Sequence, residues 1–481
     1  MKPMTAKVFA TEAVHSLPEF EQRALAIAEA LRERGVSDGT RVMLKAGNSA
    51  GYVGVLLALM HAGASIVMVD HQERVEATRR ICDRAGVKIC VVDDDTPMPG
   101  GGPARVTVYE LLLASVEQTP AERRLSLDTW CELPDGLIMW SSGSTGEPKG
   151  VVKTGAKFLK NLERNARQVG HRPDDVLLPL LPFSHQYGLS MVLIAWLVKC
   201  SLVIAPYRRL DRAMTMAGVC GVTVVDATPA SYRSMLNMIG RKPALAYELS
   251  GVRMFCSGAA PLDPGLVADY VTRFGLPLLD SYGSTEAGNV AFATEDNTVA
   301  CGRAVEGLKL RIVDDEGAGL TSGEVGEIQV HSPDLMEGYL AEDGTVDPVD
   351  PARTDWYPTG DFGYLDGGDN LFVLGRKNAV HRNGHTLYPE LIEHKLAAAG
   401  CLVKVVPVPD EQRGCQLFFF VEDEQQREPR HWREPITALL PDFEQPNRVH
   451  VLERFPLNRN GKPDKRQLEQ LALDLAPGAR A

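Results

Sequence analysis

The stretch that does most to decide the fold reads Met139-Trp140-Ser141-Ser142-Gly143-Ser144-Thr145-Gly146-Glu147-Pro148-Lys149-Gly150. It continues an apolar, strand-like run that begins at Leu137. A loop of Ser, Thr and Gly offers backbone N–H groups and hydroxyls with little steric bulk, and Lys149 adds a positive charge. A strand followed by such a loop predicts an α/β fold that binds a polyphosphate. It is not a Walker A loop, because Gly146 is followed by Glu-Pro-Lys and the chain contains no Gly-Lys-Ser or Gly-Lys-Thr.

Helical and strand-like patterns alternate on both sides of this stretch. Upstream, helical spacing and short apolar runs predict helices over 19–34, 52–61 and 75–85 and strands over 41–45, 64–69 and 87–92. The alternation resumes at Leu137 and continues to about Gly283. Alternating elements of this length predict doubly wound α/β sheets with parallel strands.

The character of the sequence changes after Leu308. Shorter strands, over 309–313 and 327–331, predict a small β-rich layer. After Arg376 comes a compact unit with a helix that begins at Pro389, strands over 402–408 and 416–421, and a helical tail. We therefore predict an N-terminal domain over 1–375, a hinge over 376–378 and a small α+β domain over 379–481.

The composition limits the classes of function. The chain has 481 residues, of which 44% are hydrophobic and 24% charged, as in an ordinary globular protein. Its formal charge of −12 argues against a non-specific nucleic-acid binder. Nine dispersed cysteines without a CxxC pair suggest reduced thiols and no zinc site. With neither a signal-type nor a membrane-spanning run, we expect a cytoplasmic enzyme.

The stretch from 141 to 150 resembles the phosphate loop of the acyl-adenylate-forming superfamily. This superfamily includes acyl- and aryl-CoA synthetases, luciferases and peptide-synthetase adenylation domains. Ser141 and Ser144 replace two threonines of the usual pattern and keep the hydroxyls. Five more segments resemble family motifs, in the family's order: 257–262, 280–286, 357–361, 375–377 and 456–462. Each alone could be an ordinary turn or core segment, but together they make coincidence a poor explanation.

The resemblance implies an ATP site built from these motifs. In the phosphate loop it assigns Ser141, Ser142, Gly143, Ser144, Thr145, Gly146 and Lys149. The adenine would lie along Gly258, Ala259 and Ala260 and meet the second motif, Asp280, Ser281, Tyr282 and Gly283. In that motif Asp280 would meet the adenine amine and Tyr282 would stack on the ring. Asp361 would accept hydrogen bonds from the ribose, with Arg376 close to ribose and phosphate.

The resemblance also implies the catalytic groups. Thr285 would touch the α-phosphate, and Glu286 would help to hold Mg²⁺, which prefers hard oxygen ligands. Lys462 would bridge the acid's carboxylate and the α-phosphate. In this family the C-terminal domain rotates between two half-reactions, so a mobile C-terminal domain is expected. The hinge here looks one residue short, which leaves the pivot open between Lys377 and Asn378.

The segment from Leu181 to Leu189 bears on the choice of acid. Amino-acid-activating relatives carry an aspartate there, whereas this chain carries Phe183-Ser184-His185-Gln186. His185 resembles the pocket-wall histidine of acyl- and aryl-CoA synthetases; the alternatives are a core histidine bonded to the backbone and, less favoured, a general base. The predicted pocket also takes in Gly258, Gly283, Gly288 and Asn289. The nearby Arg208, Arg209 and Arg212 are expected to form a solvated basic face.

These observations predict an AMP-forming acid–thiol ligase. It would convert a small carboxylic acid and ATP to acyl-AMP and pyrophosphate, then pass the acyl group to a thiol, preferably coenzyme A. The phosphopantetheine of an acyl carrier protein is the alternative acceptor. Other possibilities are transfer to a different nucleophile and a nucleotide-binding protein without thioester activity. We expect no nucleic-acid partner, no membrane span, and a monomer or homodimer.

Overall fold

The structure is a computed structural model. It describes residues 6–98, 101–142, 148–314, 316–350, 355–376, 380–382, 385–410, 414–458 and 461–476. The chain divides into two compact units. The first unit comprises Met1–Ala259, Phe274–Leu310 and Val330–Tyr357, and the second comprises Ala260–Arg273, Arg311–Gln329 and Pro358–Ala481.

The first unit contains an eight-stranded sheet that includes the predicted phosphate-loop strand. The strand order is β20-β19-β8-β7-β4-β3-β5-β6. The bounds are β3 Arg41–Lys45, β4 Ser65–Met68, β5 Ile89–Val92, β6 Ala104–Thr107, β7 Leu137–Ser142, β8 Pro148–Lys153, β19 Gly338–Leu340 and β20 Val346–Pro348. The strands from β7 to β6 run parallel, as predicted. The sheet is nevertheless mixed, because β8 returns antiparallel to β7 and then pairs with β19.

A seven-stranded sheet and a small antiparallel sheet complete the first unit. The large sheet has the order β13-β12-β11-β9-β10-β1-β2 and is parallel apart from the β1–β2 pair. Its bounds are β1 Lys7–Ala10, β2 Val14–Ser16, β9 Val176–Pro179, β10 Ser201–Ile204, β11 Val224–Ala227, β12 Met254–Ser257 and β13 Leu278–Leu279. The small sheet consists of β14 Ser281–Ser284, β15 Gly288–Phe292 and β16 Arg303–Ala304.

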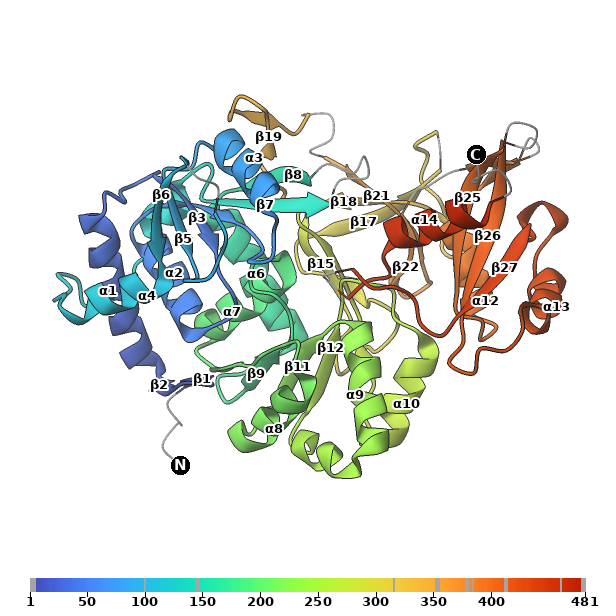
Figure 1. Ribbon diagram of the computed structural model, residues 1–481, viewed down its shortest axis with the longest axis horizontal. Coiled ribbons are helices and arrows are strands. Elements are labelled where there is room, and N and C mark those ends of the chain that lie inside the picture. The colour runs from blue at the N-terminus through green and yellow to red at the C-terminus, as the bar shows by residue number, and fades with distance from the viewer. Residues whose placement is uncertain are drawn as a thin grey trace. The chain divides into compact units, whose positions relative to one another are not determined.

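The helices of the first unit pack beside these sheets (Figure 1). Their bounds are α1 Leu17–Glu33, α2 Ala50–His61, α3 Val75–Ala85, α4 Val108–Val116, α5 Asp128–Glu132, α6 Gly155–Val169, α7 Gln186–Val198, α8 Leu210–Cys220, α9 Pro229–Arg241 and the 3₁₀ segment η1 Pro243–Leu249. The sequence explains where several begin: Ser16 and Glu19 form a capping box at α1, and Ser49 caps α2. Almost every residue of α2 is buried, which fits its continuous apolar sequence.

The second unit contains the predicted β-rich layer and the C-terminal α+β fold. The layer is a four-stranded sheet, β17 Lys309–Val313, β18 Gly326–His331, β21 Tyr357–Leu365 and β22 Leu371–Arg376, and the hairpin β23 Val380–Arg382 and β24 His385–Leu387 follows it. The C-terminal sheet is β25 Val403–Asp410, β26 Gly414–Glu422 and β27 Arg448–Leu452. The helices are α10 Pro264–Phe274, α12 Pro389–Ala397, α13 Pro429–Leu439, η2 Asp442–Glu444 and α14 Lys465–Leu475.

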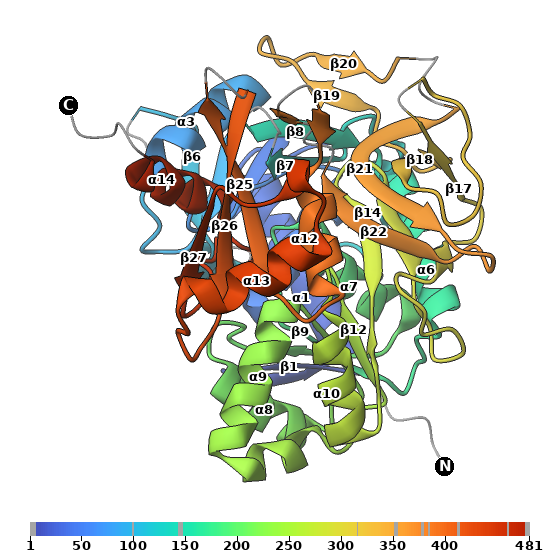
Figure 2. The same ribbon diagram turned by 90° about the vertical axis from the view of Figure 1, so that its right-hand side faces the viewer.

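Strand β26 organises the core of the C-terminal sheet by the two-residue period of a β-strand. Leu417 and Phe419 pack with residues of α12 and α13, whereas Phe418 and Phe420 pack with Leu468 of α14. Figure 2 shows α12 and α13 on one side of this sheet and α14 on the other. The sheet is therefore covered by helices on both faces.

The predicted fold class is confirmed: a large α/β unit with doubly wound sheets, and a smaller α+β fold at the C-terminus. The predicted boundaries at 375 and 379 stay a prediction. Among the helices within the described ranges, none combines the length and hydrophobicity that a bilayer crossing requires.

Candidate active site

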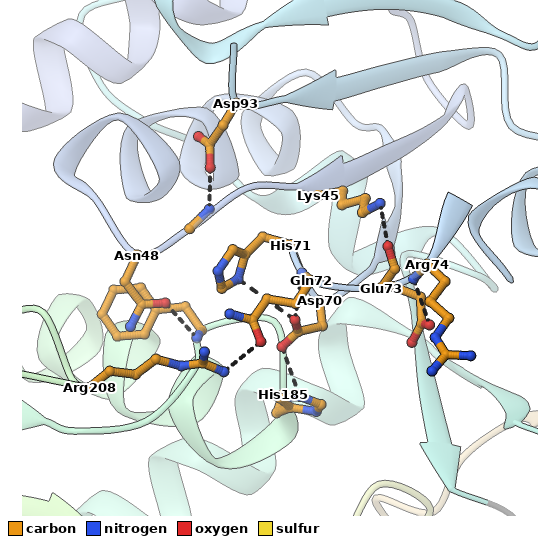
Figure 3. A network of polar contacts seen from close by, with 12 residues as sticks. Lys45, Asn48, Asp70, His71, Gln72, Glu73, Arg74, Asp93, His185 and Arg208 are labelled. Atoms are coloured by element: carbon orange, nitrogen blue, oxygen red, sulfur yellow. Dashed lines mark hydrogen bonds and ion pairs between the residues drawn. The ribbon is translucent and has the colours of Figure 1, made fainter. Parts of the chain in front are cut away.

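The predicted pocket histidine is held by a carboxylate (Figure 3). His185 lies at the start of α7, and its Nε2 is 3.4 Å from Oδ2 of Asp70, in the loop after β4. Asp70 Oδ1 accepts a hydrogen bond from the Gln72 backbone, and these contacts with His185 and Gln72 lower the pKa of Asp70 to about 2 although burial opposes the shift. The sequence left open a core histidine bonded to the backbone. The structure instead gives His185 a carboxylate partner and leaves 35% of its side chain exposed.

Two loops at the carboxyl ends of parallel strands fix the segment from Leu181 to Leu189, which is predicted to bind the acid. After β3, the Asn48 amide donates to the Leu181 carbonyl at 2.8 Å and accepts from the Phe183 N–H at 2.9 Å. After β4, the carbonyl of Glu73 accepts a hydrogen bond from the buried amine of Lys45 at 2.8 Å, which ties down the loop that carries Asp70 (Figure 3). Carboxyl ends of parallel strands are where ligands bind in sheets of this kind.

The glycine of the His-x-x-Gly pattern has a packing role. A Cβ built on Gly188 would lie 2.2 Å from the Pro182 carbonyl oxygen, so the first turn of α7 could not approach its own loop with any larger residue. The predicted solvated face is consistent with the contacts: Arg208 is exposed and donates to Gln72, and Arg209 is exposed and pairs with Asp211.

The predicted magnesium ligand lies beside the strand that leads into the phosphate loop. Glu286 follows β14 in the tight turn before β15, together with Thr285. Its Oε1 accepts hydrogen bonds from Ser141 Oγ at 3.2 Å and from the Tyr339 hydroxyl at 3.3 Å. The ring of Tyr339 also lies 5.1 Å from the amine of Lys149. Ser141 and Lys149, register partners across β7 and β8, are thus brought close to Glu286, which is far from both in the sequence.

This arrangement suits Mg²⁺ bound mainly through substrate phosphates. Within the described ranges no three His, Cys, Asp or Glu side chains are grouped as a metal site. Mg²⁺ commonly takes one or two protein carboxylates and completes its shell with phosphates and water. A half-buried carboxylate with two hydroxyls around it fits that requirement.

A buried lysine adds positive charge near Glu286. Lys153, at the end of β8, is 1% exposed, and its amine donates to the Asp334 carbonyl. Burial lowers the pKa of Lys153 to about 8, against the opposing effect of Glu286 and Asp334. Asp334 is also bonded by Arg164. The sequence did not single out this lysine, because a strand-terminal lysine usually reaches solvent.

Asp280, predicted to meet the adenine amine, is partly buried and is hydrogen-bonded within the protein. Its Oδ1 accepts from the Ser281 N–H, and Cys301 donates its S–H to Oδ2 at 3.4 Å. Burial raises the pKa of Asp280 to about 7. Tyr282 is 8% exposed, on the same strand as Ser281. The contacts of Asp280 and Tyr282 with adenine stay predictions.

The segment after β12 has unusual backbone geometry. Ala259 has a φ of +69°, a left-handed conformation that costs a residue with a side chain about 1–2 kcal/mol. Beside it, a Cβ built on Gly258 would lie 2.5 Å from Ser281 Oγ and 3.1 Å from Tyr187 Cε1. At Gly258, the two segments predicted to contact adenine therefore meet Tyr187 of the predicted acid-binding segment. Such strain is typical of ligand sites.

The other predicted pocket residues form a close cross-strand contact. A Cβ on Gly283 would lie 2.7 Å from the Gly288 carbonyl oxygen, and Gly288 has a φ of +78°. Asn289 is buried, and Asn161 of α6 bonds both its N–H and its carbonyl. Close packing therefore explains why glycine stands at positions 283 and 288. That Gly283, Gly288 and Asn289 line the acid pocket stays a prediction.

The second unit brings together the predicted ribose and hinge residues. Asp361 and Arg376 face each other across β21 and β22, with 3.1 Å between Arg376 Nε and Asp361 Oδ1. Arg376 also donates to the Thr359 carbonyl at 2.9 Å, and Thr359 Oγ1 accepts from the Asp361 N–H. Asp361 is 8% exposed, so the pair presents an oriented carboxylate in the middle of β21.

Lys462 belongs to the same cluster. The residue as a whole is exposed, but protein atoms crowd its amine, and this desolvation lowers its pKa. Asp361 opposes the shift and Arg376 adds to it, so all three predicted residues share one electrostatic environment. The loop that carries Lys462 is fixed by Asn458, whose side chain accepts from the Lys462 N–H at 3.0 Å.

Some predictions fall outside the described residues. These are Gly143, Ser144, Thr145 and Gly146 of the phosphate loop, the pivot candidates Lys377 and Asn378, and Gly384. The strand placement of Ser142 is described but its side chain is not. Ala260 follows Ala259 and is partly exposed.

Sequence reasoning missed several partners of the predicted residues. Asp70, Asn48 and Tyr339 each bond a predicted site residue or its segment from a distant part of the chain. A signal existed for Asp70 and Asn48, since each lies within three residues of the carboxyl end of a parallel strand. No sequence signal pointed to Tyr339.

The family model that describes an AMP-binding enzyme matches residues 3–340. The chain belongs to the family of AMP-binding enzymes. The relationship predicted from the motifs is confirmed, and so is the predicted class of enzyme, an AMP-forming acid–thiol ligase.

Similar proteins span nearly the whole enzyme. A 4-coumarate–CoA ligase of Pinus taeda is 27% identical, with 94% of this chain and 89% of the relative covered. A fatty acid–[acyl-carrier-protein] ligase, ScoC, of Streptomyces coeruleorubidus is 26% identical, with 97% and 93% covered. The structure of ATP-bound MatB from Rhodopseudomonas palustris superposes with a TM-score of 0.85 at 23% identity, covering 98% of this chain and 97% of that one, and it supports the fold.

Proposed function

We propose that this enzyme activates an aryl or short-to-medium acyl carboxylic acid with ATP and passes the acyl group to coenzyme A. The main observation that supports the proposal is the position of Glu286. Its carboxylate is held by Ser141 and Tyr339 at the strand that leads into the phosphate loop. A carboxylate held there would otherwise repel phosphates, so it needs a cation such as Mg²⁺.

In the first half-reaction, an oxygen of the substrate carboxylate attacks the α-phosphorus of ATP. The bond to the β-phosphate oxygen breaks, and pyrophosphate leaves. Lys462 would neutralise charge on the carboxylate and the α-phosphate, and Thr285 would donate to that phosphate. Mg²⁺ held by Glu286 would neutralise charge on the phosphates. Asp361 would orient the ribose, so the catalytic effect is mainly alignment and charge neutralisation.

In the second half-reaction, the sulfur of a thiolate attacks the acyl carbonyl carbon and AMP leaves with the bonding electron pair. We propose that a C-terminal domain over 379–481 turns on a hinge over 376–378 relative to a domain over 1–375. Lys462 would then leave the site, and the face that carries Gly384 would replace it. Arg376, the last residue of β22, would be the first residue of this hinge.

The acid class follows from the segment that holds His185. No carboxylate occurs at 183–186 to bind an α-ammonium group. His185 is partly exposed and oriented by Asp70, which suits a wall of the acid pocket. Gly258, Gly283, Gly288 and Asn289 would line the same acid pocket as His185. Adenine would lie along Gly258, Ala259 and Ala260.

Coenzyme A is the preferred acceptor because the His-x-x-Gly pattern resembles that of CoA synthetases. The phosphopantetheine of an acyl carrier protein is the second candidate, favoured by the similarity to a fatty acid–[acyl-carrier-protein] ligase. We place the reaction in the cytoplasm, carried out by a monomer or homodimer.

The test is a screen of carboxylic acids with ATP, Mg²⁺ and hydroxylamine, which traps acyl-adenylates as hydroxamates. Aryl and short-to-medium acyl acids should give hydroxamate, and free α-amino acids should give little. A free α-amino acid as the best substrate would overturn the acid class. If no acid gives hydroxamate or pyrophosphate exchange while nucleotide still binds, the protein is a nucleotide binder without this activity.

A further inference from the structure

Lys153 places a buried positive charge on the face of the eight-stranded sheet from which Tyr339 reaches Glu286. Side chains alternate along a strand, so Lys153 shares a face of β8 with Val151. Val151 is the register partner of Tyr339, whose hydroxyl donates to Oε1 of Glu286. Lys153 follows Val151 by two residues, or about 7 Å along the strand. The cation therefore lies on the same side of the sheet as a group that holds the predicted magnesium ligand.

One short segment connects Lys153 to Glu286. At its start, the Asp334 carbonyl accepts a hydrogen bond from the Lys153 amine at 3.4 Å. Two residues later, the Met336 N–H donates to the Glu286 carbonyl at 2.9 Å. At its end, the Tyr339 hydroxyl bonds the Glu286 carboxylate. The segment therefore contacts the cation once and the predicted metal ligand twice, through its backbone and through its side chain.

Two other carboxylates near Lys153 are paired with different cations. Asp334 is bonded by Arg164, and Glu337 lies 2.6 Å from the Lys157 amine. An ammonium group has three donors, and within the described ranges the Lys153 amine has one acceptor, the Asp334 carbonyl. A buried charge is costly unless an opposite charge balances it. Lys153 therefore depends on a further anion.

Glu286 is the anion that fits. Burial lowers the pKa of Lys153 to about 8, and among the acidic residues Glu286 opposes this shift most, ahead of Asp334 and Glu337. Most molecules therefore carry the Lys153 charge at pH 7. Opposite charges interact strongly where water is excluded, and each keeps the other ionised. In the absence of metal, Lys153 is thus the cation that balances the Glu286 carboxylate.

We propose that Lys153 is a positioning residue that balances the charge of Glu286 and thereby makes the site accept Mg²⁺ bound to ATP in preference to free Mg²⁺. This inference rests on the proposed function and adds the form in which the metal enters. A fixed cation near the carboxylate ligand opposes the binding of a divalent cation. The phosphates of ATP offset this repulsion, because the complex of Mg²⁺ with ATP has a net negative charge. Free Mg²⁺ has no such compensation.

The experiment measures metal binding directly. Mn²⁺ serves as a paramagnetic probe in place of Mg²⁺, and electron paramagnetic resonance counts the free ion. Without nucleotide, Lys153→Met should bind Mn²⁺ about 10- to 100-fold more tightly than the wild type, because it removes one buried positive charge and keeps the length of the side chain. Its affinity for the preformed complex of Mn²⁺ with a non-hydrolysable ATP analogue should not rise, since that complex is negatively charged.

Two control variants separate the charge from the packing. Lys153→Arg keeps the positive charge and should bind free Mn²⁺ within about threefold of the wild type. Lys157→Met removes a nearby lysine that is partly exposed and paired with Glu337, so the affinity should again stay within about threefold. If Lys153→Met does not melt cooperatively, Lys153→Gln replaces it, because glutamine is neutral and can still donate to the Asp334 carbonyl.

The direction of the change decides the outcome. Damage to the fold would weaken metal binding, so tighter binding by Lys153→Met is a result that a purely structural lysine would not give. Unchanged or weaker binding of free Mn²⁺ in Lys153→Met and Lys153→Gln would overturn the inference, and so would equal tightening in Lys153→Arg or Lys157→Met. If Glu286→Gln binds the complex of Mn²⁺ with the analogue as tightly as the wild type, the proposed metal ligand itself has failed.

Discussion

Replacing Lys462 by alanine separates the two half-reactions. The Lys462 amine lies in the environment of Asp361 and Arg376, where protein atoms desolvate it and lower its pKa. A partly desolvated cation interacts strongly with the charge that develops on the α-phosphate during adenylation. Removal of a single group of this kind typically costs about 10²–10³ in kcat, or about 2.7–4 kcal/mol.

The loop should survive this substitution. Its geometry depends on backbone and Asn458 contacts: Asn458 N–H donates to the Lys462 carbonyl at 2.7 Å, and the Asn458 side chain accepts from the Lys462 N–H. The Lys462 side chain contributes to neither bond. Because the residue is exposed, the change in the free energy of unfolding should stay within about 0.5 kcal/mol.

The assay measures each half-reaction alone. Acid-dependent pyrophosphate exchange reports adenylation, and CoA thioester formed from synthetic acyl-AMP reports transfer. Lys462→Ala should lower the first by about 10²–10³-fold and leave the second within about threefold. Lys465→Ala is the matched control: Lys465 lies three residues on and pairs with Glu390 at 2.7 Å, so both rates should stay near wild type. Equal losses of both half-reactions in Lys462→Ala would refute the alternating use of this lysine.

Three further predictions follow from other contacts. Glu286→Gln should keep the fold and weaken adenylation at least 10²-fold at low Mg²⁺, because it removes the charge of a hard-cation ligand; normal activity there would disprove the assignment. Asp70→Asn should raise KM for the acid by about 10-fold and leave KM for ATP unchanged, since it removes the carboxylate partner of His185; equal rises in both would contradict this. Burial lowers the pKa of His171 in the native protein to about 4, whereas the histidine of the unfolded chain takes up a proton near pH 6.5. Because the unfolded chain binds more protons between these two values, the free energy of unfolding should fall as the pH falls from about 6.5 toward 4. Urea unfolding at pH 7 and pH 5 should show that the His171→Gln variant loses less stability than the wild type, by up to about 1.4 kcal/mol per pH unit. If the free energy of unfolding depends on pH in the same way in both proteins, His171 does not make this contribution.

Local sequence patterns were sufficient to predict most of the helices and strands. Helix α3 was predicted at its observed bounds, Val75–Ala85, because its apolar residues repeat at helical spacing and Gly86 ends it in a left-handed conformation. The antiparallel return at β8 was not predicted. Strand β8 begins at Pro148, inside the motif taken as a loop, and its pairing with β19 depends on a segment almost 190 residues later.

The candidate site was predictable in its residues and less so in its contacts. Motifs led to Glu286, Asp361 and Lys462 because each stands in a short, ordered pattern. Their partners come from distant segments, and a single sequence does not record such pairings.

The most direct measurement of the proposed reaction is its product balance. The enzyme is incubated with ATP, Mg²⁺, coenzyme A and the best acid of the screen, and nucleotides, pyrophosphate and thioester are quantified together. Acyl-CoA, AMP and pyrophosphate should appear in equal amounts, and omission of coenzyme A should leave acid-dependent pyrophosphate exchange intact. Formation of ADP and inorganic phosphate, or thioester without AMP, would contradict an acyl-adenylate mechanism.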